Sequence, residues 1–382
     1  MMNSKKTNVV LVAIIAFLLG GAVFTAVAFG FAGLGETEIK LNINGSKSQD
    51  KYKISEEIFQ LIDEDYYKKV NSEDTITWMN KGIVAGLNDP YSSYFTKEEF
   101  NEFLISVNGE FDGIGISFIK KKDGSFEIVK VVEDSPADKS GLKKHDIIRS
   151  VDDKDVSKIK DVASVLRGKA GTFVKITVER KDKLIDFKIK RDTIESEKLE
   201  VKHLKDNVGY IKILGFDRGT FDLFKRELDQ MEADNTESLV IDLRDNGGGL
   251  VDEAVKITDE LLGKCKIATV RDKNGIKDTY KSDSKKTLLP FVVLVNENTA
   301  SASEIMASAI KDNDAAKLVG TKTFGKGVIQ NTIKLSNGGA LKLTVGEYYS
   351  ANGHKINKKG ISPDYNVKDS KKQLKKAIDL LI

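Results

Sequence analysis

The chain has 382 residues, a charged fraction of 31% and a formal net charge of +3. This length allows two or three domains with cores of their own, and the nearly balanced charge excludes a strongly basic nucleic-acid-binding protein. The single cysteine, Cys265, excludes an internal disulfide framework and a cysteine-built zinc site. The three histidines form no closely spaced ligand pair, so we expect neither a metal nor another cofactor.

The N-terminal segment is apolar. Lys5 and Lys6 precede an uncharged run over 7–35, which is longer than the roughly 20 apolar residues that span a bilayer. We therefore predict that residues 1–35 are a cytoplasmic stub and a transmembrane anchor, with the bulk of the chain outside the cytoplasm. A cleaved signal peptide ending near Ala28 is the alternative, and it also predicts export.

A polar linker is expected over 36–51, followed by a helical region over 52–105. Hydrophobic residues such as Ile54, Ile58 and Leu61 recur there at helical spacing. The segment from Asn88 to Pro90 interrupts this pattern. We expect this region to be structural or to serve as an assembly surface.

A small β-rich domain is predicted over 106–191. Its elements are the strands Phe126–Val132, Asp146–Asp152, Val174–Val178 and Leu184–Ile189 and the helix Val162–Leu166. This order resembles a bacterial PDZ domain, whose glycine-rich loop is here Gly113, Ile114, Gly115 and Ile116. In such a module a peptide adds as a strand to the sheet edge, and loop N–H groups cradle its terminal carboxylate. Each glycine alone could equally serve a bulge or a tight turn.

An α/β core is predicted over 192–369, with a short amphipathic helix over 370–382. The core alternates a helix, Phe221–Met231, with the strands Val208–Ile213, Ser238–Leu243, Phe291–Val295 and Ala340–Val345. The strand Phe291–Val295 is a continuous apolar run, which is typical of a strand covered on both faces.

Two short segments, 299–305 (TASASEI) and 324–330 (FGKGVIQ), contain residues suited to nucleophilic chemistry. Ser301 opens a predicted helix, whereas Lys326 and Gln330 lie on a predicted strand, where alternation places them on one face. A serine hydroxyl needs an adjacent base, and lysine is a base only when its pKa is lowered. If the segments meet, they supply a nucleophile, a base and a neutral glutamine that orients the base.

Other interpretations of these residues exist. Ser301 and Glu304 also fit a helix capping box, and Ser303 is a rival nucleophile. The segment 320–326 nearly matches a phosphate-binding loop, but the residue after it is Gly327, and a strand follows where that motif needs a helix. A serine–histidine–aspartate triad would need His203 or His354, and the latter is expected to lie on the surface.

Six collinear motifs resemble those of the C-terminal processing peptidases, or tail-specific proteases, of the membrane-anchored bacterial type. They are Asn88–Phe95, the PDZ-like unit, Ile241–Gly249, Thr299–Ile305, Gly325–Gln330 and Gly360–Asp364. The resemblance runs from about Tyr52 to the end of the chain. It implies a ClpP/crotonase-like α/β peptidase core, a PDZ domain as a partial β-barrel, a helical N-terminal region and one transmembrane helix.

The resemblance also implies roles for particular residues. Ser301 would be the nucleophile, Lys326 the general base and Gln330 the residue that orients it. The backbone N–H groups of Gly247 and Ala302 would form the oxyanion hole, with Gly248 as the alternative to Gly247.

The expected partners are proteins or peptides with exposed C-termini, which the PDZ domain would bind and which could gate activity. The membrane is a partner through the N-terminal helix, a homodimer is compatible with the resemblance, and no nucleic acid is expected. Two rival functions remain at this stage, a non-catalytic membrane-bound PDZ scaffold and a ligand-binding protein on the same α/β core.

Overall fold

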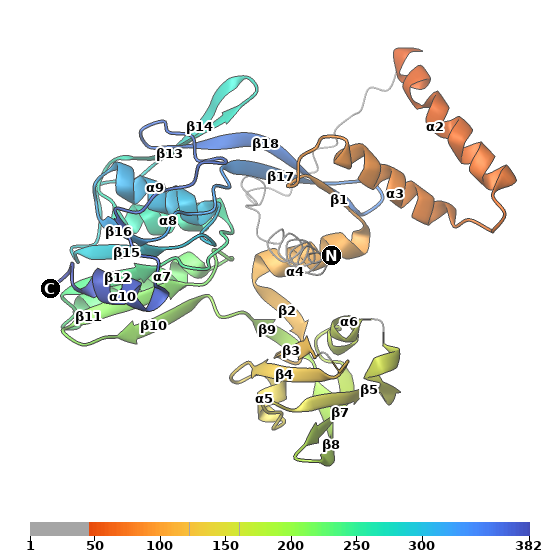
Figure 1. The fold of residues 1–382 in the computed structure, drawn as a ribbon, viewed down its shortest axis with the longest axis horizontal. Coiled ribbons are helices and arrows are strands. Elements are labelled where there is room, and N and C mark those ends of the chain that lie inside the picture. Colours follow the sequence, from red (N-terminus) through yellow and green to blue (C-terminus); the bar gives the residue numbers. More distant parts are fainter. Residues whose placement is uncertain (1–45, 122, 160) are drawn as a thin grey trace, which may run out of the picture. The chain divides into compact units, whose positions relative to one another are not determined.

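The computed structural model describes residues 46–121, 123–159 and 161–382, which form two compact units (Figure 1). Residues 104–198 form the inserted unit, and the chain before and after them forms the α/β unit. The predicted anchor, residues 1–35, lies outside the described residues. No helix within the described ranges is long and apolar enough to cross a bilayer.

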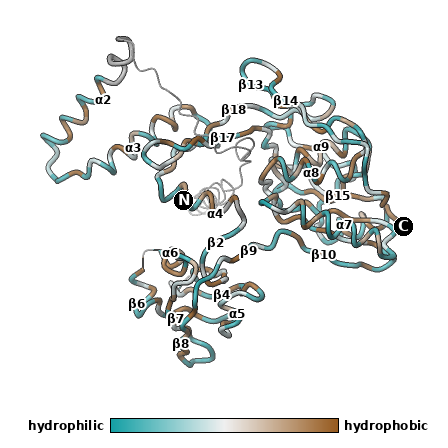
Figure 2. The backbone as a smooth tube through the Cα atoms, turned by 180° about the vertical axis from the view of Figure 1, so that it is seen from behind, coloured by the Kyte–Doolittle hydropathy of each residue, from teal (hydrophilic) through white to brown (hydrophobic). Residues whose placement is uncertain are grey.

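The N-terminal part of the described chain is mainly helical. Its elements are α2 (Ser46–Asp65), α3 (Ser72–Ala85), β1 (Ser93–Phe95) and α4 (Lys97–Asn108). The first helix begins inside the segment predicted as a linker, and the strand β1 was not predicted. Hydrophobic residues alternate with polar ones along α2 and α3 (Figure 2), and several of them, including Ile54 and Trp78, are exposed.

The inserted unit is a small β-rich domain. Its elements are β2 (Glu110–Gly113), β3 (Ile116–Lys120), β4 (Phe126–Val131), α5 (Pro136–Lys139), β5 (Ile147–Val151), β6 (Lys154–Asp155), a 3₁₀ turn (Val156–Lys158), α6 (Val162–Leu166), β7 (Phe173–Arg180), β8 (Lys183–Lys190) and β9 (Asp192–Glu195). The main sheet has the order β3-β4-β5-β7-β8, so β3 is an edge strand. Alternate side chains such as Ile128, Ile148 and Ile176 fill the core. The predicted helix and strands are confirmed, with small shifts at the strand ends.

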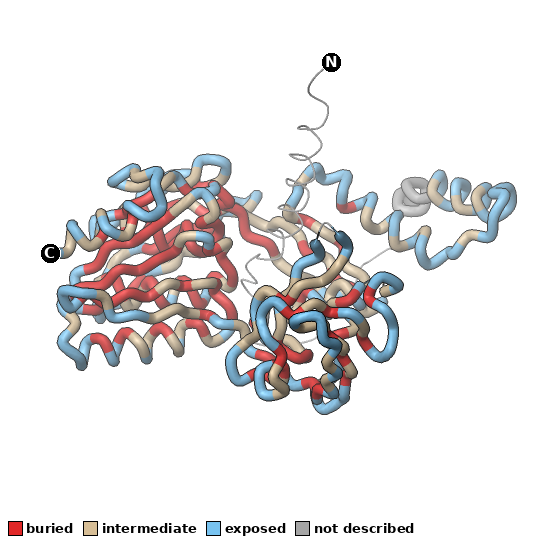
Figure 3. The backbone as a smooth tube through the Cα atoms, turned by 60° about the horizontal axis from the view of Figure 1, so that its bottom comes forward, coloured by how far each residue is buried: buried red, intermediate tan, exposed pale blue. Residues whose placement is uncertain are grey.

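The α/β unit is built on a largely parallel sheet of order β10-β11-β12-β15-β16-β19. Its elements are β10 (Leu199–His203), β11 (Val208–Ile213), α7 (Thr220–Ala233), β12 (Ser238–Asp242), α8 (Val251–Leu261), β15 (Phe291–Val295), α9 (Ala302–Asp312), β16 (Lys317–Gly320), β19 (Tyr365–Asn366) and α10 (Ser370–Ile378). Parallel neighbours need long crossovers, which the helices supply. All five residues of β15 are buried, as predicted for a strand covered on both faces, and buried residues dominate the strands in Figure 3.

A second, antiparallel sheet positions the candidate site. Its strands are β13 (Lys266–Asp272), β14 (Gly275–Lys281), β17 (Val328–Lys334) and β18 (Ala340–Ser350), joined by β1. The long strand β18 pairs with β17 and β13, and Ser93 of β1 lies opposite Lys342. The sheet therefore brings the segment after α3 beside strands that follow it by more than two hundred residues.

Candidate active site

Ser301 occupies a strained position at the start of α9. Its backbone has φ 58° and ψ −119°, whereas a helix-capping residue normally has an extended backbone and positive φ is costly for a residue other than glycine. The side chain is 1% exposed. Its Oγ has no hydrogen-bond partner among the described residues. The capping-box relation of Ser301 and Glu304 is present, since the Glu304 carboxylate accepts the Ser301 N–H. Ser301 Oγ itself makes no cap hydrogen bond within the described ranges and is therefore available as a nucleophile.

Ser303, the rival nucleophile, has a different environment. It is fully buried in the first turn of α9, and its hydroxyl donates to the backbone carbonyl of Asn246 at 3.1 Å. That bond ties the helix to the glycine-rich loop. The structure therefore gives Ser303 a structural contact and leaves Ser301 as the uncommitted serine.

The buried carboxylate of Glu304 joins the serine segment to the lysine segment. Oε2 accepts the backbone N–H of Ser301 at 3.0 Å and that of Lys326 at 2.8 Å. Oε1 accepts the N–H of Gly325 at 2.7 Å and the hydroxyl of Thr323 at 2.5 Å. Burial raises the pKa of this carboxyl, and the four hydrogen bonds oppose that rise. Two residues far apart in sequence thus share one acceptor atom.

Lys326 is buried beside this network, with 4% of its surface exposed. Burial and the positive charge of Lys342 lower its pKa to about 7, against the opposing charges of Glu304 and Asp89. The ring of Tyr91 lies over the ammonium nitrogen, 4.9 Å from it. A lysine in this environment carries a substantial neutral fraction at neutral pH, which is the state that can accept a proton.

The prediction that Lys326 lies on a strand is wrong. The strand β17 begins at Val328, and a register shift interrupts its pairing between Ile329 and Gln330. Strand alternation therefore does not relate Lys326 to Gln330. The loop before the strand is instead held by the turn over 356–361, since Lys358 donates its N–H to the Gly325 carbonyl at 2.7 Å.

Gln330 is 1% exposed, and one end of its amide is fixed. Its Nε2 donates to the hydroxyl of Thr344 at 3.2 Å. Its carbonyl Oε1 is buried without a hydrogen-bond partner in the described chain. A buried carbonyl with unused lone pairs is costly to leave unsatisfied, and it is the atom that the orienting role requires.

The glycine-rich loop lies against the start of α9. A Cβ on Gly248, which has φ +106°, would stand 2.8 Å from the Cβ of Ser301 and 3.0 Å from the nitrogen of Ala302. The N–H of Gly248 already donates to Oδ1 of Asn246 at 2.8 Å. Within the described ranges, the N–H groups of Gly247 and Ala302 have no acceptor. Gly247 is thus better suited than Gly248 to supply an oxyanion donor.

Sequence reasoning missed part of this site, the turn that precedes β1 together with Lys342. The Asp89 carboxylate accepts the hydroxyl of Ser92 at 2.5 Å and also hydrogen-bonds Thr344. Ser92 Oγ in turn accepts the N–H of Thr344 at 3.0 Å. The signal was present, because the segment 88–95 is one of the recognised motifs, but its sequence alone did not indicate a role.

The glycine-rich loop of the inserted unit is ordered by packing. Gly113 ends β2, Ile114 is buried in the core, and Ile116 begins the edge strand β3. A Cβ on Gly115, with φ +84°, would stand 2.3 Å from the Cβ of Ser135, so only glycine fits there. The outer edge of β3 has no paired strand in the described chain. This edge is the feature that an added peptide strand requires.

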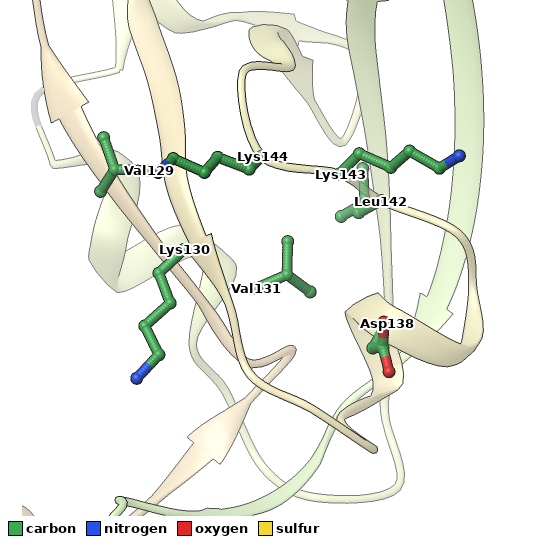
Figure 4. A pocket seen from close by; sticks show the side chains of 7 residues that line it. All are labelled: Val129, Lys130, Val131, Asp138, Leu142, Lys143 and Lys144. Carbon is green, nitrogen blue, oxygen red and sulfur yellow. The ribbon is translucent and has the colours of Figure 1, made fainter.

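The inserted unit also has a pocket beside β4 (Figure 4). It is lined by Val129, Lys130, Val131, Asp138, Leu142, Lys143 and Lys144. These side chains come from β4, from α5 and from the segment after α5, and none belongs to the loop over 113–116. The pocket borders the predicted peptide-binding loop, because the lining residue Val131 lies opposite Ile116 and the next residue, Val132, donates its N–H to the Gly115 carbonyl at 2.9 Å.

The alternative catalytic residues are not assembled. His203 and His354 are both exposed, and the segment after Lys326 continues as β17, not as the helix of a phosphate-binding loop. Asp242 is buried, where it pairs with Arg244 and accepts the Tyr210 hydroxyl at 2.8 Å. These contacts give Asp242 a structural role.

The chain is similar to known proteins over most of its length. Three family models match the chain: Peptidase family S41 over 207–367, PDZ domain over 113–190, and Activating protease CtpB N-terminal domain over 32–99. The PDZ match coincides with the inserted unit. The S41 match contains the Ser301, Lys326 and Gln330 segments.

Full-length relatives extend the similarity beyond single domains. A probable CtpA-like serine protease of Staphylococcus haemolyticus is 36% identical over 361 residues, which cover 92% of this chain and 72% of that protein. The carboxy-terminal processing protease CtpA of Bacillus subtilis is 35% identical, covering 86% of this chain and 72% of that protein. Among solved structures, the photosystem II D1 C-terminal processing protease shares the fold, with a TM-score of 0.53 and 24% sequence identity. The match covers 83% of this chain and 86% of that protein.

Proposed function

Because this chain is a serine endopeptidase that belongs to the C-terminal processing peptidases of family S41, we propose that it works with a Ser301–Lys326 dyad and Gln330. The observation that carries this proposal is the shared acceptor Oε2 of Glu304, which holds the serine and the lysine segments together. The buried, unpartnered Oγ of Ser301 and the lowered pKa of Lys326 support it.

The proposed reaction proceeds through an acyl-enzyme. Neutral Lys326 accepts the hydroxyl proton as Ser301 Oγ attacks the scissile carbonyl, and the oxyanion is bound by the N–H groups of Gly247 and Ala302. The lysine then donates that proton to the departing amine as the peptide C–N bond breaks. Water attacks the ester while the lysine again accepts a proton, and its return to Oγ releases the new carboxyl end.

The Gln330 carbonyl is proposed to accept a hydrogen bond from the Lys326 amine and so to direct its lone pair toward the serine. A carboxylate in this place would stabilise the ammonium form, whereas an amide adds no charge. The bond from Nε2 to Thr344 supports this role, because it fixes the carbonyl end of the amide.

Unfolded casein is expected to be cleaved when it is incubated with the full chain in detergent. The Ser301→Ala protein, treated in the same way, is the control for contaminating peptidases. Absence of cleavage by a folded wild-type protein, with and without added C-terminal peptides, would contradict the proposed activity.

We also propose that the PDZ domain binds substrate C-termini at the edge of β3. A peptide with a free carboxylate is then expected to have a several-fold lower KM than its amidated form, because the loop over 113–116 binds that carboxylate. Gly115→Ala should remove the difference, since its Cβ would meet Ser135, whereas Gly124→Ala has open space at a similar φ of +85° and is the control. Equal KM values for the free and amidated peptides would refute this role.

Gating by the PDZ domain is a separate proposal. In a gated enzyme, peptides bind the active state of the protein more tightly than the inactive state and so shift the equilibrium toward it. Short peptides that bind this domain should therefore raise the turnover of an unrelated small substrate. Unchanged turnover would leave the domain as a tether.

The cellular setting is proposed from the N-terminal sequence. A single membrane span within 1–35 would place the rest of the chain outside the cytoplasm. Digestion of the chain by a protease added to intact cells tests this topology.

A homodimer is proposed through α2 and α3, whose exposed hydrophobic residues include Trp78 and Ile83. Light scattering of the detergent-solubilised chain would show a monomer if this proposal is wrong.

A further inference from the structure

A second lysine, Lys342, lies buried on β18 two residues before Thr344, which lies opposite Gln330 and accepts a hydrogen bond from its Nε2 at 3.2 Å. Residues two apart on a strand share a face, so Lys342 lies on the same face of β18 as this partner of Gln330. It is 3% exposed and is a residue of β18, where it pairs with Ser93 of β1 and with Thr332 of β17. An ammonium group at such a position must be stabilised by its surroundings, because burial removes its hydration.

Two features near Lys342 partly offset the effect of burial and favour its charged form. Its Nζ lies 5.4 Å from the centre of the Phe95 ring and 5.7 Å from that of Phe103, and these rings stack on each other at 5.1 Å. Aromatic faces attract cations. The negative charge of Asp89 acts in the same sense, so burial lowers the pKa of Lys342 only to about 8. Lys342 is therefore mostly protonated at neutral pH.

Four ionisable groups surround Lys326 from the neighbouring elements. Lys342 comes from β18, Glu304 from α9, and Asp89 and Tyr91 from the turn before β1. The two carboxylates favour the ammonium form of Lys326. The positive charge of Lys342 disfavours that form, in addition to the larger effect of burial.

We propose that Lys342 is a positioning residue, whose ammonium charge adds to the burial of Lys326 and favours the neutral amine that accepts the Ser301 proton. The inference rests on the proposed Ser–Lys mechanism and adds a role to it. The turn before β1 and the rings of Phe95 and Phe103 would then serve the reaction by holding a charge in place.

Replacing Lys342 by methionine removes the charge and retains an unbranched side chain in the buried space. The acidic limb of kcat/KM is then expected to move upward by about one pH unit, because the pKa of Lys326 rises when a like charge is removed. Activity at pH 6 should fall about tenfold, with recovery near pH 9, where Lys326 is neutral in both proteins. The measurement is kcat/KM for a fluorogenic peptide against pH, with the rate of Ser301 labelling by a fluorophosphonate as a second readout.

Two further variants make the test specific. Lys342→Arg keeps the charge, so its acidic limb should not move upward. If the methionine variant fails to fold, an upward shift in Lys342→Arg alone would contradict the inference. Lys334→Met makes the same change at an exposed position of β17 and should leave the limb in place.

Three outcomes would overturn the inference: an unshifted limb in Lys342→Met, a loss that is equal at every pH, or an upward shift in Lys342→Arg as large as that in the methionine variant. Failure of the underlying mechanism is distinguishable, because it would appear as cleavage that survives in Lys326→Ala.

Discussion

Ser301→Ala and Lys326→Ala are each expected to lower kcat/KM by about 10⁴-fold or more, because nucleophile and base act as one unit. The fold should survive Ser301→Ala, since the hydroxyl has no hydrogen bond to lose among the described residues. Peptide cleavage and labelling by a fluorophosphonate would both report the loss.

Matched variants separate chemistry from packing in this experiment. Lys326→Arg keeps length and charge but cannot deprotonate, so it should be as inactive as the alanine variant. Ser303→Ala removes a neighbouring buried hydroxyl that bonds Asn246 and should retain most activity. Activity that survives in Ser301→Ala but is lost in Ser303→Ala would identify Ser303 as the nucleophile.

The active wild-type protein should also show an acidic limb near pH 7. The pKa of Lys326 is lowered to about 7, and its active form is the neutral amine. Activity is therefore lost as the pH falls through that value and is retained above it. A limb near pH 10 would show that the lysine is not desolvated in solution.

Glu304→Ala is expected to destabilise the α/β unit by about 4 kcal/mol, because it leaves several buried donors without an acceptor, each costing about 1–3 kcal/mol. Those donors are the N–H groups of Ser301, Gly325 and Lys326 and the hydroxyl of Thr323. Activity should be lost as well, since the serine and lysine segments are no longer tied together. Urea unfolding followed by circular dichroism measures the loss.

The control for this substitution is Glu297→Ala. Glu297 is an exposed residue whose carboxylate accepts the Thr321 hydroxyl at 2.7 Å. Its loss should cost less than about 1 kcal/mol. Equal destabilisation by the two variants would show that the Glu304 network contributes little to stability.

Much of the fold was predictable because its signals are local. The apolar run Phe291–Val295 predicts a buried strand whatever its neighbours are, and the periodicity over 221–231 predicts α7, which extends over Thr220–Ala233. The helix over 162–166 likewise carries its own boundaries, since Asp161 caps it with hydrogen bonds to two backbone N–H groups.

The prediction for Lys326 failed for the opposite reason. The segment 324–330 was predicted to be a strand, yet the N–H groups of Gly325 and Lys326 donate to the Glu304 carboxylate and not to a neighbouring strand. The Gly325 carbonyl accepts the N–H of Lys358, in the turn over 356–361. The Thr323 hydroxyl accepts the Ile361 N–H at 2.7 Å while it donates to Glu304. Tertiary contacts outweigh local propensity here.

The sequence by itself determined which residue types are available for the chemistry: one serine at a helix start, a lysine and a glutamine close together, and a glycine-rich loop. These are covalent and local properties, and they also carry the family resemblance. Only the tertiary structure decided how the chemistry is tuned. Lys342 and Asp89 reach the site because β1 pairs with β18, and a pKa depends on burial and on charges across space, which no sequence spacing encodes.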